Sequence, residues 1–171
     1  MAFCDIDGAR FRRKYRAVPL GESEAGAISA VYKAVWLTAY DYPHEWREKR
    51  AMTVDTVRSE MNAGYFFFGV YAAGTLVGVY KASLTERGCY GEQQAVLPEY
   101  QNQGVAYAMY EQFLAFAKTN HCKVNYVNIL IGNEPCERAM QRYHFYKTGE
   151  PWEQAKGMWV QTYERKVEED C

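Results

Sequence analysis

Apolar residues recur every three or four positions in the first third of the chain, which is the spacing of a helix with one buried face. The Gly21–Glu24 segment, with acidic residues at the positive helix end, predicts where this helix starts. We expect the helix to run to about Tyr40, with Pro43 closing it. A second, charged helix begins near His44 or at Thr53–Asp55 and stops at 62–64. The positions that define the first helical face are Ala27, Ile28, Val31, Ala34, Val35 and Thr38.

Other segments carry the alternating or continuous apolar patterns of strands. The sequence also predicts a helix over Gly104–Lys118 and another after Asn133, which would cap it, with Pro135 in its first turn. This order of elements predicts an α/β fold with a mixed sheet and helices on both faces. The expected strands are an edge strand at Phe11–Val18, a central strand at Tyr65–Tyr71, its hairpin partner Thr75–Leu84, then Gly91–Leu97, Val124–Ile131 (buried except for Asn125 and Asn128), and a late hairpin of Glu150–Gln154 and Met158–Tyr163.

Length and charge narrow the class of protein. The chain has 171 residues, which suits a single domain over 1–171, with a charged tail at 164–171 that we expect to fray. The formal net charge of −1 argues against nucleic acid or an anionic membrane as the main partner. No run approaches the ~20 apolar residues of a membrane helix, and the N-terminus lacks the apolar core of a signal peptide.

The cysteines indicate neither a disulfide framework nor a metal site. There are five, they are scattered, and none forms a C-x-x-C pair or combines with the three histidines in a zinc pattern. We therefore expect reduced thiols, no metal and a cytoplasmic location.

The segment from Val96 to Ala106 carries the most informative chemistry. It has the order of a short strand, a Pro-Glu-Tyr corner, a polar turn and a helix start, with Gln101, Gly104 and Ala106 spaced as Q-x-x-G-x-A. The first turn of a helix offers unpaired backbone N–H groups and the positive end of the macrodipole. A glycine there leaves room for a phosphate to approach them. The alternative is an ordinary strand-to-helix corner.

This segment resembles the acetyl-CoA-binding signature of the GCN5-related N-acetyltransferase (GNAT) superfamily. The resemblance is most specific over Glu92–Lys118 and extends more loosely from Leu76 to Glu150, with a hairpin at 69–78 before it and a last helix at 133–145 after it. It implies a GNAT-like acyl-CoA N-acyltransferase fold with a central mixed, mostly antiparallel sheet, and acetyl-CoA as cosubstrate. The coenzyme-binding residues that it implies are Val96, Leu97, Gln101, Asn102, Gln103, Gly104, Val105, Ala106 and Asn133.

Glu92 is the candidate general base. Period-two alternation places it on the same strand face as Gln94 and Val96, and members of the resembled family often keep a glutamate on this strand. Tyr90 is a weaker alternative, and a Glu92 that faces solvent would have no catalytic role. A backbone N–H near Val96 would polarise the thioester carbonyl.

The general acid is where the sequence departs from the resembled family. The tyrosine that members usually carry in the last helix falls on Met140, whether it is counted from Asn133 or back from Phe145, and the expected glycine is His144. A thioether cannot donate a proton. Three readings follow: the departing thiolate is protonated by water, Tyr143 takes the role, or catalysis has been lost.

An aromatic segment between the first two helices is the candidate acceptor site. Tyr40, Asp41 and Tyr42, together with Gln94, would bind a cationic amine through charge pairing and cation–π attraction. Trp36, Trp46 and the late-hairpin tryptophans Trp152 and Trp159 would add to the wall. The competing interpretation is that these aromatics are core residues and that Asp41 is a turn residue.

The sequence therefore predicts an N-acetyltransferase, an enzyme that moves an acetyl group from acetyl-CoA to a primary amine of a small molecule or peptide by direct attack in a ternary complex. The alternatives are a protein N-terminal or lysine acetyltransferase, and a non-catalytic acyl-CoA-binding module. A homodimer formed through exposed aromatics or the late hairpin is compatible with all three functions.

Overall fold

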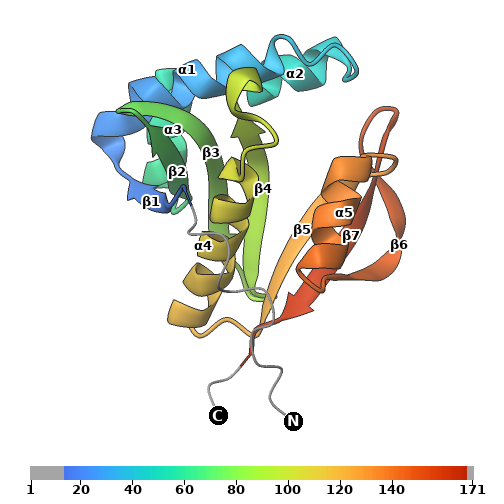
Figure 1. Ribbon diagram of the computed structural model, residues 1–171. Coiled ribbons are helices and arrows are strands. Elements are labelled where there is room, and N and C mark those ends of the chain that lie inside the picture. The colour runs from blue at the N-terminus through green and yellow to red at the C-terminus, as the bar shows by residue number, and fades with distance from the viewer. Residues whose placement is uncertain (1–13, 169–171) are drawn as a thin grey trace.

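The computed structural model describes residues 14–168, which form one seven-stranded mixed sheet flanked by helices (Figure 1). The strand order is β1-β2-β3-β4-β5-β7-β6, and every neighbouring pair is antiparallel except β4 with β5. The elements are β1 (Ala17–Leu20), α1 (Ala25–Trp36), α2 (His44–Arg50), α3 (Val54–Asn62), β2 (Phe66–Ala72), β3 (Thr75–Leu84), β4 (Cys89–Val96), α4 (Val105–Thr119), β5 (Val124–Leu130), α5 (Glu134–Arg142), β6 (Tyr146–Ala155) and β7 (Met158–Lys166).

Most predicted elements are present, with shifted ends. The chain forms both of the charged helices that the sequence offered as alternatives, α2 and α3, and Thr53 Oγ1 caps α3 by accepting from the Thr56 N–H at 3.1 Å. Asn133 caps α5, since its Oδ1 accepts from the Cys136 N–H at 3.3 Å. The first helix ends at Trp36, not at Tyr40.

Two predictions at the chain ends were wrong in part. The edge strand is Ala17–Leu20 and includes Pro19, which an edge strand tolerates because an N–H there can be left unpaired. The first residues of the predicted Phe11–Val18 strand lie outside the described range. The tail does not fray from 164, because β7 continues to Lys166 and pairs with β5 from Val160 to Lys166.

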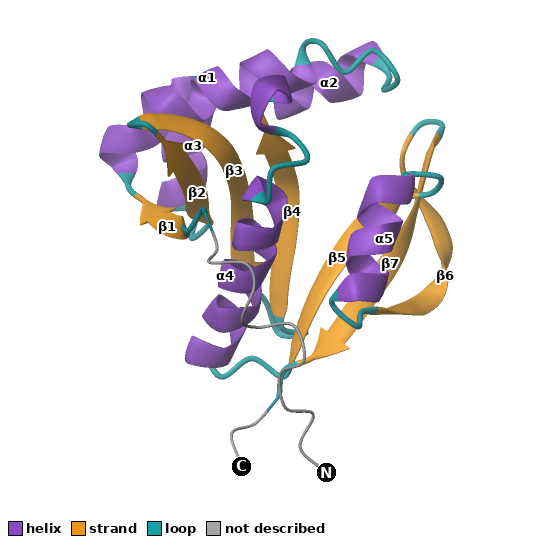
Figure 2. Ribbon diagram, in the orientation of Figure 1, coloured by secondary structure: helices purple, strands orange, loops and turns teal. Residues whose placement is uncertain are grey.

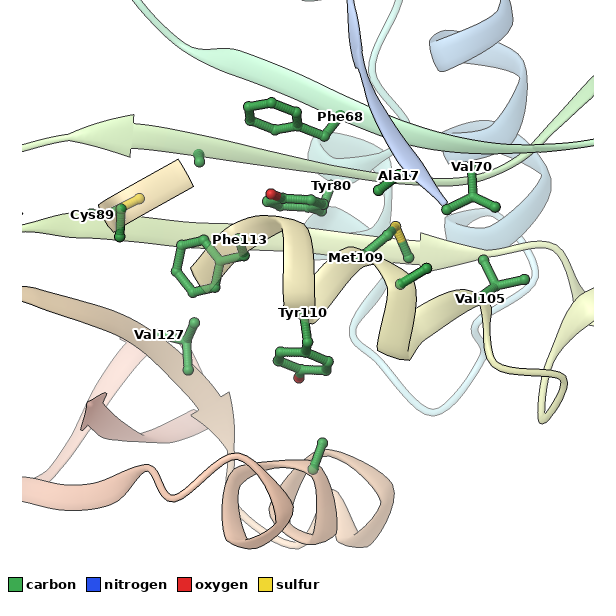
Figure 3. Close-up of a cluster of buried hydrophobic side chains, with 14 of the residues drawn as sticks. Ala17, Phe68, Val70, Tyr80, Cys89, Val105, Met109, Tyr110, Phe113 and Val127 are labelled. Carbon is green, nitrogen blue, oxygen red and sulfur yellow. The ribbon is translucent and has the colours of Figure 1, made fainter. Parts of the chain in front are cut away.

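Helices α1 and α3 cover one face of the sheet, and α4 and α5 cover the other (Figure 2). The larger core lies under α4, where Met109 and Phe113 pack on Phe68, Tyr80 and neighbouring strand residues (Figure 3). Helix α4 approaches β3 so closely that a Cβ at Gly78 would lie 2.6 Å from a Val105 methyl carbon. A smaller core on the opposite face joins α1 and α3 to β2, β3 and β4.

A β-bulge in β4 reverses the face on which its later side chains lie. Glu92 pairs with Lys81, but Ala95 pairs with Val79, so β4 has one residue more than β3 over this stretch. Gln93 absorbs the extra residue with a left-handed φ of 53°. The bulge puts Glu92 on the same face as Ala95 and opposite Val96, so the predicted shared face of Glu92 and Val96 was wrong.

Strands β4 and β5 separate soon after they meet. Their parallel pairing covers only Cys89 to Gly91 against Asn125 to Val127, after which the ribbons diverge (Figure 2). Asn125 was predicted to be an exception to burial on β5, yet it is only 1% exposed. Its Nδ2 donates to the Phe113 carbonyl at 3.0 Å, which satisfies the buried amide and ties α4 to β5 at the base of the split.

Candidate active site

The turn before α4 presents backbone to the surface. Asn102 and Gly104 both have left-handed φ angles, 58° and 92°, and nothing lies within 4 Å of a Cβ built on Gly104. Val105 is buried, which fixes the orientation of the first helical turn. The N–H groups of that turn have no acceptor within the helix, so they and the macrodipole form a local site for an anion.

Two glutamine side chains brace this turn. Gln101 Nε2 donates to the Val96 carbonyl at 3.2 Å, and Gln103 Nε2 donates to the Glu99 carbonyl at 2.8 Å. The family resemblance implied that Gln101 binds the coenzyme. In the structure one of its amide hydrogens already holds the end of β4, so the anion site is mainly backbone.

The backbone of Val96 faces the split between β4 and β5. The Leu97 N–H donates to the Val77 carbonyl at 2.9 Å, so it points toward β3. Because successive backbone groups of a strand point to opposite sides, the Val96 N–H and carbonyl point toward β5. The hydrogen bond from Gln101 to that carbonyl agrees with this direction. A peptide N–H therefore lies at the mouth of the split, as the sequence reading required.

A cavity of about 220 Å³ fills the split and reaches both faces of the sheet. On the α1 side its wall includes Trp36, Tyr42, Trp46, Arg50 and Glu92. On the α4 side it includes Met109, Tyr110, Phe113 and Cys136, while Val127 to Leu130 of β5 close it laterally. Two reactants could therefore meet here from opposite faces of the sheet.

Glu92 lies in the wall of this cavity and not on a solvent-facing hairpin. Its side chain is 21% exposed, and its Oε1 is 3.5 Å from Lys81 Nζ. Lys81 is almost fully buried, at 5% exposure, and also bonds Glu60 Oε2 of α3 at 2.7 Å. Its ammonium group lies over the Tyr65 ring at 4.5 Å. Lys81 thus fixes a carboxylate at the edge of the cavity through a charge-assisted contact.

Tyr90, the alternative base, is poorly suited to the role. Its hydroxyl accepts from Asn128 Nδ2 at 3.2 Å and its ring stacks on Tyr126. Burial, together with the nearby Glu92 carboxylate, raises the pKa of Tyr90 to about 12. A phenol with that pKa holds its proton near neutral pH and cannot serve as a general base there.

The structure separates Met140 and Tyr143 from the cavity. Met140 is completely buried in the core under α5. Tyr143 lies outside the cavity wall, with its ring stacked on Tyr110 at 5.2 Å and its hydroxyl donating to the Tyr107 carbonyl at 3.4 Å. Tyr110, which the sequence reading did not consider, does line the cavity, and burial raises the pKa of its phenol well above the usual value.

Replacing Tyr143 with phenylalanine is therefore expected to change kcat by less than about tenfold, because its hydroxyl is held away from the cavity. A lost general acid lowers the rate by ~10²–10⁴-fold. Steady-state thiol release checks this, with Tyr110→Phe as the matched variant of the same stacked pair. A kcat loss of the larger size in Tyr143→Phe alone would identify Tyr143 as the proton donor.

The aromatic segment forms a compact cluster at the end of α1. Trp36 meets the Tyr42 and Trp46 rings edge-on at 5.6 and 5.4 Å, and Tyr42 stacks on Trp46 at 4.7 Å. The cation that lies on this cluster belongs to the protein: the Arg50 guanidinium carbon is 3.6 Å from the Trp46 ring centre and 5.1 Å from that of Trp36. The prediction that these rings are open to a cationic amine therefore needs correction.

The predicted acceptor residues divide into two groups. Tyr42 and Gln94 line the cavity, and Asn133 joins them there, donating from Nδ2 to the Tyr42 hydroxyl at 3.4 Å. Tyr40 and Asp41 lie outside it: Tyr40 is 77% exposed, with the Arg47 guanidinium over its ring, and Asp41 is exposed in the turn. Of the late hairpin, Met158, Val160 and Gln154 reach the cavity, while Trp152 donates to Thr162 Oγ1 at 3.2 Å.

Sequence reasoning missed Arg50, Gln93, Tyr110 and Cys136 in the cavity wall. Arg50 carried no local signal beyond being a basic residue at a helix end, and Gln93 enters the wall only because of the bulge. Burial raises the pKa of Cys136, so it is a neutral thiol near pH 7. Over residues 14–168 there is no cluster of three or more His, Cys, Asp or Glu side chains that could hold a metal, and none of the helices is long and apolar enough to cross a membrane.

Comparison with known proteins agrees with this architecture. The fold is shared with the PaiA N-acetyltransferase of Thermoplasma acidophilum in complex with coenzyme A, with a TM-score of 0.72, 16% identity, and coverage of 90% of this chain and 99% of that one. The yncA protein of Salmonella typhimurium, solved with its cofactor acetyl-CoA, gives a TM-score of 0.74 at 14% identity, covering 92% and 96%. A GNAT-family acetyltransferase of Streptococcus pneumoniae gives 0.75 at 12%, covering 91% and 100%.

A comparison with curated protein sequences gives no significant match. At the low identities of the structural neighbours, their likeness establishes the fold alone. The sequence model of the acetyltransferase (GNAT) family, however, matches residues 28–145, well over half of the chain. That span includes the bulged β4, the turn at Gly104 and the capped helix α5. The chain therefore belongs to the acetyltransferase (GNAT) family.

Proposed function

We propose that this protein is an acetyl-CoA-dependent N-acetyltransferase that acetylates a primary amine by direct attack in a ternary complex. The observation that carries the proposal is the cavity in the β4–β5 split, which touches both faces of the sheet and has a carboxylate, Glu92, in its wall. The GNAT family match and the two neighbours solved with coenzyme A or acetyl-CoA support the choice of acyl donor.

The residues around the α4 turn fit a coenzyme A pyrophosphate. The left-handed Gly104 leaves the first-turn N–H groups unobstructed, and the polar side chains nearby are neutral amides. The donor would lie along the free edge of β4, and its thioester carbonyl would receive the Val96 N–H. One such preorganised donor at a developing oxyanion contributes about 3 kcal/mol.

Glu92 would accept the proton of the acceptor ammonium group, directly or through a water. The neutral amine then attacks the carbonyl carbon, the new C–N bond forms, the C–S bond breaks, and the nitrogen loses its second proton to water to give the neutral amide. The departing thiolate takes its proton from water, because Met140 has no proton to give and the Tyr143 hydroxyl is turned to the Tyr107 carbonyl. A thiol pKa near ~8.5 makes thiolate a tolerable leaving group near neutrality. The buried Met109 and Phe113 line the donor side of the cavity.

Saturating acetyl-CoA is expected to raise the melting temperature of the wild-type protein. At about a hundredfold excess over Kd, binding adds ~2.7 kcal/mol, which is a rise of ~5–10 °C for a domain of this size. Gly104→Glu should abolish the rise, since it places a carboxylate where the phosphates bind. Thermal melts measure both effects, because the melting temperature of each protein with acetyl-CoA is compared with that of the same protein without it.

Gly74→Glu is the matched control. Gly74 also has a left-handed φ, 80°, and open space around its Cβ position, so it carries the same backbone strain in the β2–β3 turn, away from the site. It should keep the ligand-induced rise. If wild type shows no rise, the enzyme assignment fails. If it shows a rise but releases no thiol with any amine, the protein is a binding module.

A further inference from the structure

The α1 side of the cavity contains polar groups that the acetyl transfer described above does not use. Three of them come from different elements: the Arg50 guanidinium from α2, the Trp36 indole N–H from α1, and the Gln93 side-chain carbonyl from the β4 bulge. All three share the cavity wall with Glu92. They lie where the acceptor amine must bind if Glu92 is its base.

Each of these groups lacks a hydrogen-bond partner within the described part of the chain. Trp36 Nε1 and Gln93 Oε1 are buried atoms with none. Arg50 has neither an ion pair nor a hydrogen bond among residues 14–168: its guanidinium lies on the Trp46 and Trp36 rings, and the Glu92 carboxylate is a nearby opposite charge. Buried polar groups are nearly always paired in folded proteins, and an unpaired one costs ~1–3 kcal/mol. Such a cluster in one cavity is typical of a polar binding site.

The chemistry of the cluster is divided into donors and acceptors. Arg50 and Trp36 can only donate hydrogen bonds, and they lie close together, with the Arg50 guanidinium carbon 5.1 Å from the centre of the Trp36 ring. The Arg50 guanidinium carbon lies 3.6 Å from the centre of the Trp46 ring, and its N–H groups have no acceptor among residues 14–168, so they are available to a bidentate anion. Glu92 and the Gln93 carbonyl can only accept, and they lie on adjacent residues of β4.

We propose that the acceptor is an α-amino acid with a free carboxylate, bound through Arg50 and Trp36, with its amine held by Glu92 and the Gln93 carbonyl. This rests on the proposed function and names its substrate class. A zwitterion satisfies both halves of the cluster at once. A simple alkyl amine would satisfy the acceptors and leave the guanidinium unpaired. A peptide or protein N-terminus would offer Arg50 an amide in place of a carboxylate.

Strain at Gln93 fits the same assignment. A glutamine at φ 53° occupies a conformation that L residues seldom adopt. The bulge that creates it turns the side chain into the cavity wall, where its carbonyl finds no partner among the described residues. Strained backbone and an unsatisfied buried group at one position are typical of a binding site.

The test compares amino acids with their α-amides, which differ only at the proposed anchor. Rates of thiol release are measured with saturating acetyl-CoA and L-leucine, L-methionine or L-phenylalanine, each beside its amide, within a screen of the common L-amino acids. For an accepted amino acid, kcat/KM should exceed that of its amide by ~10–100-fold, as expected for a charge-assisted hydrogen-bonded pair. The amide has the less basic amine, so intrinsic reactivity favours the opposite order.

Arg50→Met should remove this preference, lowering kcat/KM for the acid by the same ~10–100-fold while leaving the amide nearly unchanged, mainly through KM. Arg50→Lys should restore part of it. Lys49→Met is the matched control, since it removes one positive charge from the same helix at an exposed position, and it should keep the preference. The acetyl-CoA melting shift reports whether each variant remains folded.

Two outcomes overturn the inference while the proposed function stands: amides accepted as well as acids, or amines and peptides acetylated when no amino acid is. An acid preference that survives in Arg50→Met also overturns it. Failure of the proposed function looks different, because the wild-type protein would then release no thiol with any amine, whether or not acetyl-CoA raises its melting temperature.

Discussion

Replacing Glu92 with glutamine is expected to lower kcat by ~10²–10⁴-fold, the usual loss when a general base is removed. Glutamine keeps the shape of the side chain and can still accept a hydrogen bond, but it cannot take the proton from the acceptor ammonium group. The carboxylate that does so is held 3.5 Å from Lys81 in the cavity wall. Steady-state rates over a range of pH measure the effect.

The expected signature separates a base from a merely structural residue. The acidic limb of the kcat/KM profile should change in Glu92→Gln, while the melting shift with acetyl-CoA stays as in wild type. Gln94→Ala is the control on the same strand: Gln94 also lines the cavity but carries no base, so its kcat should change far less. A Glu92→Gln variant within about tenfold of wild type would show that deprotonation does not depend on this carboxylate.

Among the substitutions considered, Lys81→Met is expected to lower the free energy of unfolding most. It leaves the Glu60 and Glu92 carboxylates without the cation that they share. Lys81 is 5% exposed and contacts Glu60 at 2.7 Å and Glu92 at 3.5 Å. Breaking a buried ion pair costs ~3–5 kcal/mol. Because the carboxylates of Glu60 and Glu92 are 25% and 21% exposed, we expect ~2–4 kcal/mol, or a melting temperature lower by ~4–16 °C.

Urea denaturation measures this free energy of unfolding directly. Lys33→Met, at an exposed site on α1, is the matched control and should change stability by less than ~0.5 kcal/mol. Adding Glu60→Leu to Lys81→Met should recover part of the loss, because it removes one of the unpaired charges. A loss of less than ~1 kcal/mol in Lys81→Met would mean that water already screens the charges of Lys81, Glu60 and Glu92 from one another.

The order of the elements and the turn at Gly104 could be predicted from the sequence, because both depend on local chemistry. Thr75–Leu84 is a strand with the predicted bounds, and the cap at Asn133 forms as its Asn and Pro spacing indicated. A glycine at a helix start indicates a left-handed backbone, and a proline in a first turn indicates the start of a helix. Both preferences depend only on residues close together in the sequence. Counting from Asn133 and back from Phe145 placed Met140 where the resembled family usually has a tyrosine, and in the structure the Met140 side chain lies in the core.

Features that depend on pairing between distant segments, such as the face on which a side chain lies, could not be predicted from the sequence. Alternation along β4 indicated one face for Glu92 and Val96, but the bulge at Gln93 arises from the register against β3 and reverses it. The aromatic segment indicated an open cation site, yet Arg50 lies on its rings because α2 packs against the end of α1 through Trp36 and Trp46. The sequence by itself determined the order of the elements and the glycine turn before α4, since each is encoded within a few residues. Only the tertiary structure decided which side chains share the cavity, because strand register and helix packing join residues that are far apart in the chain.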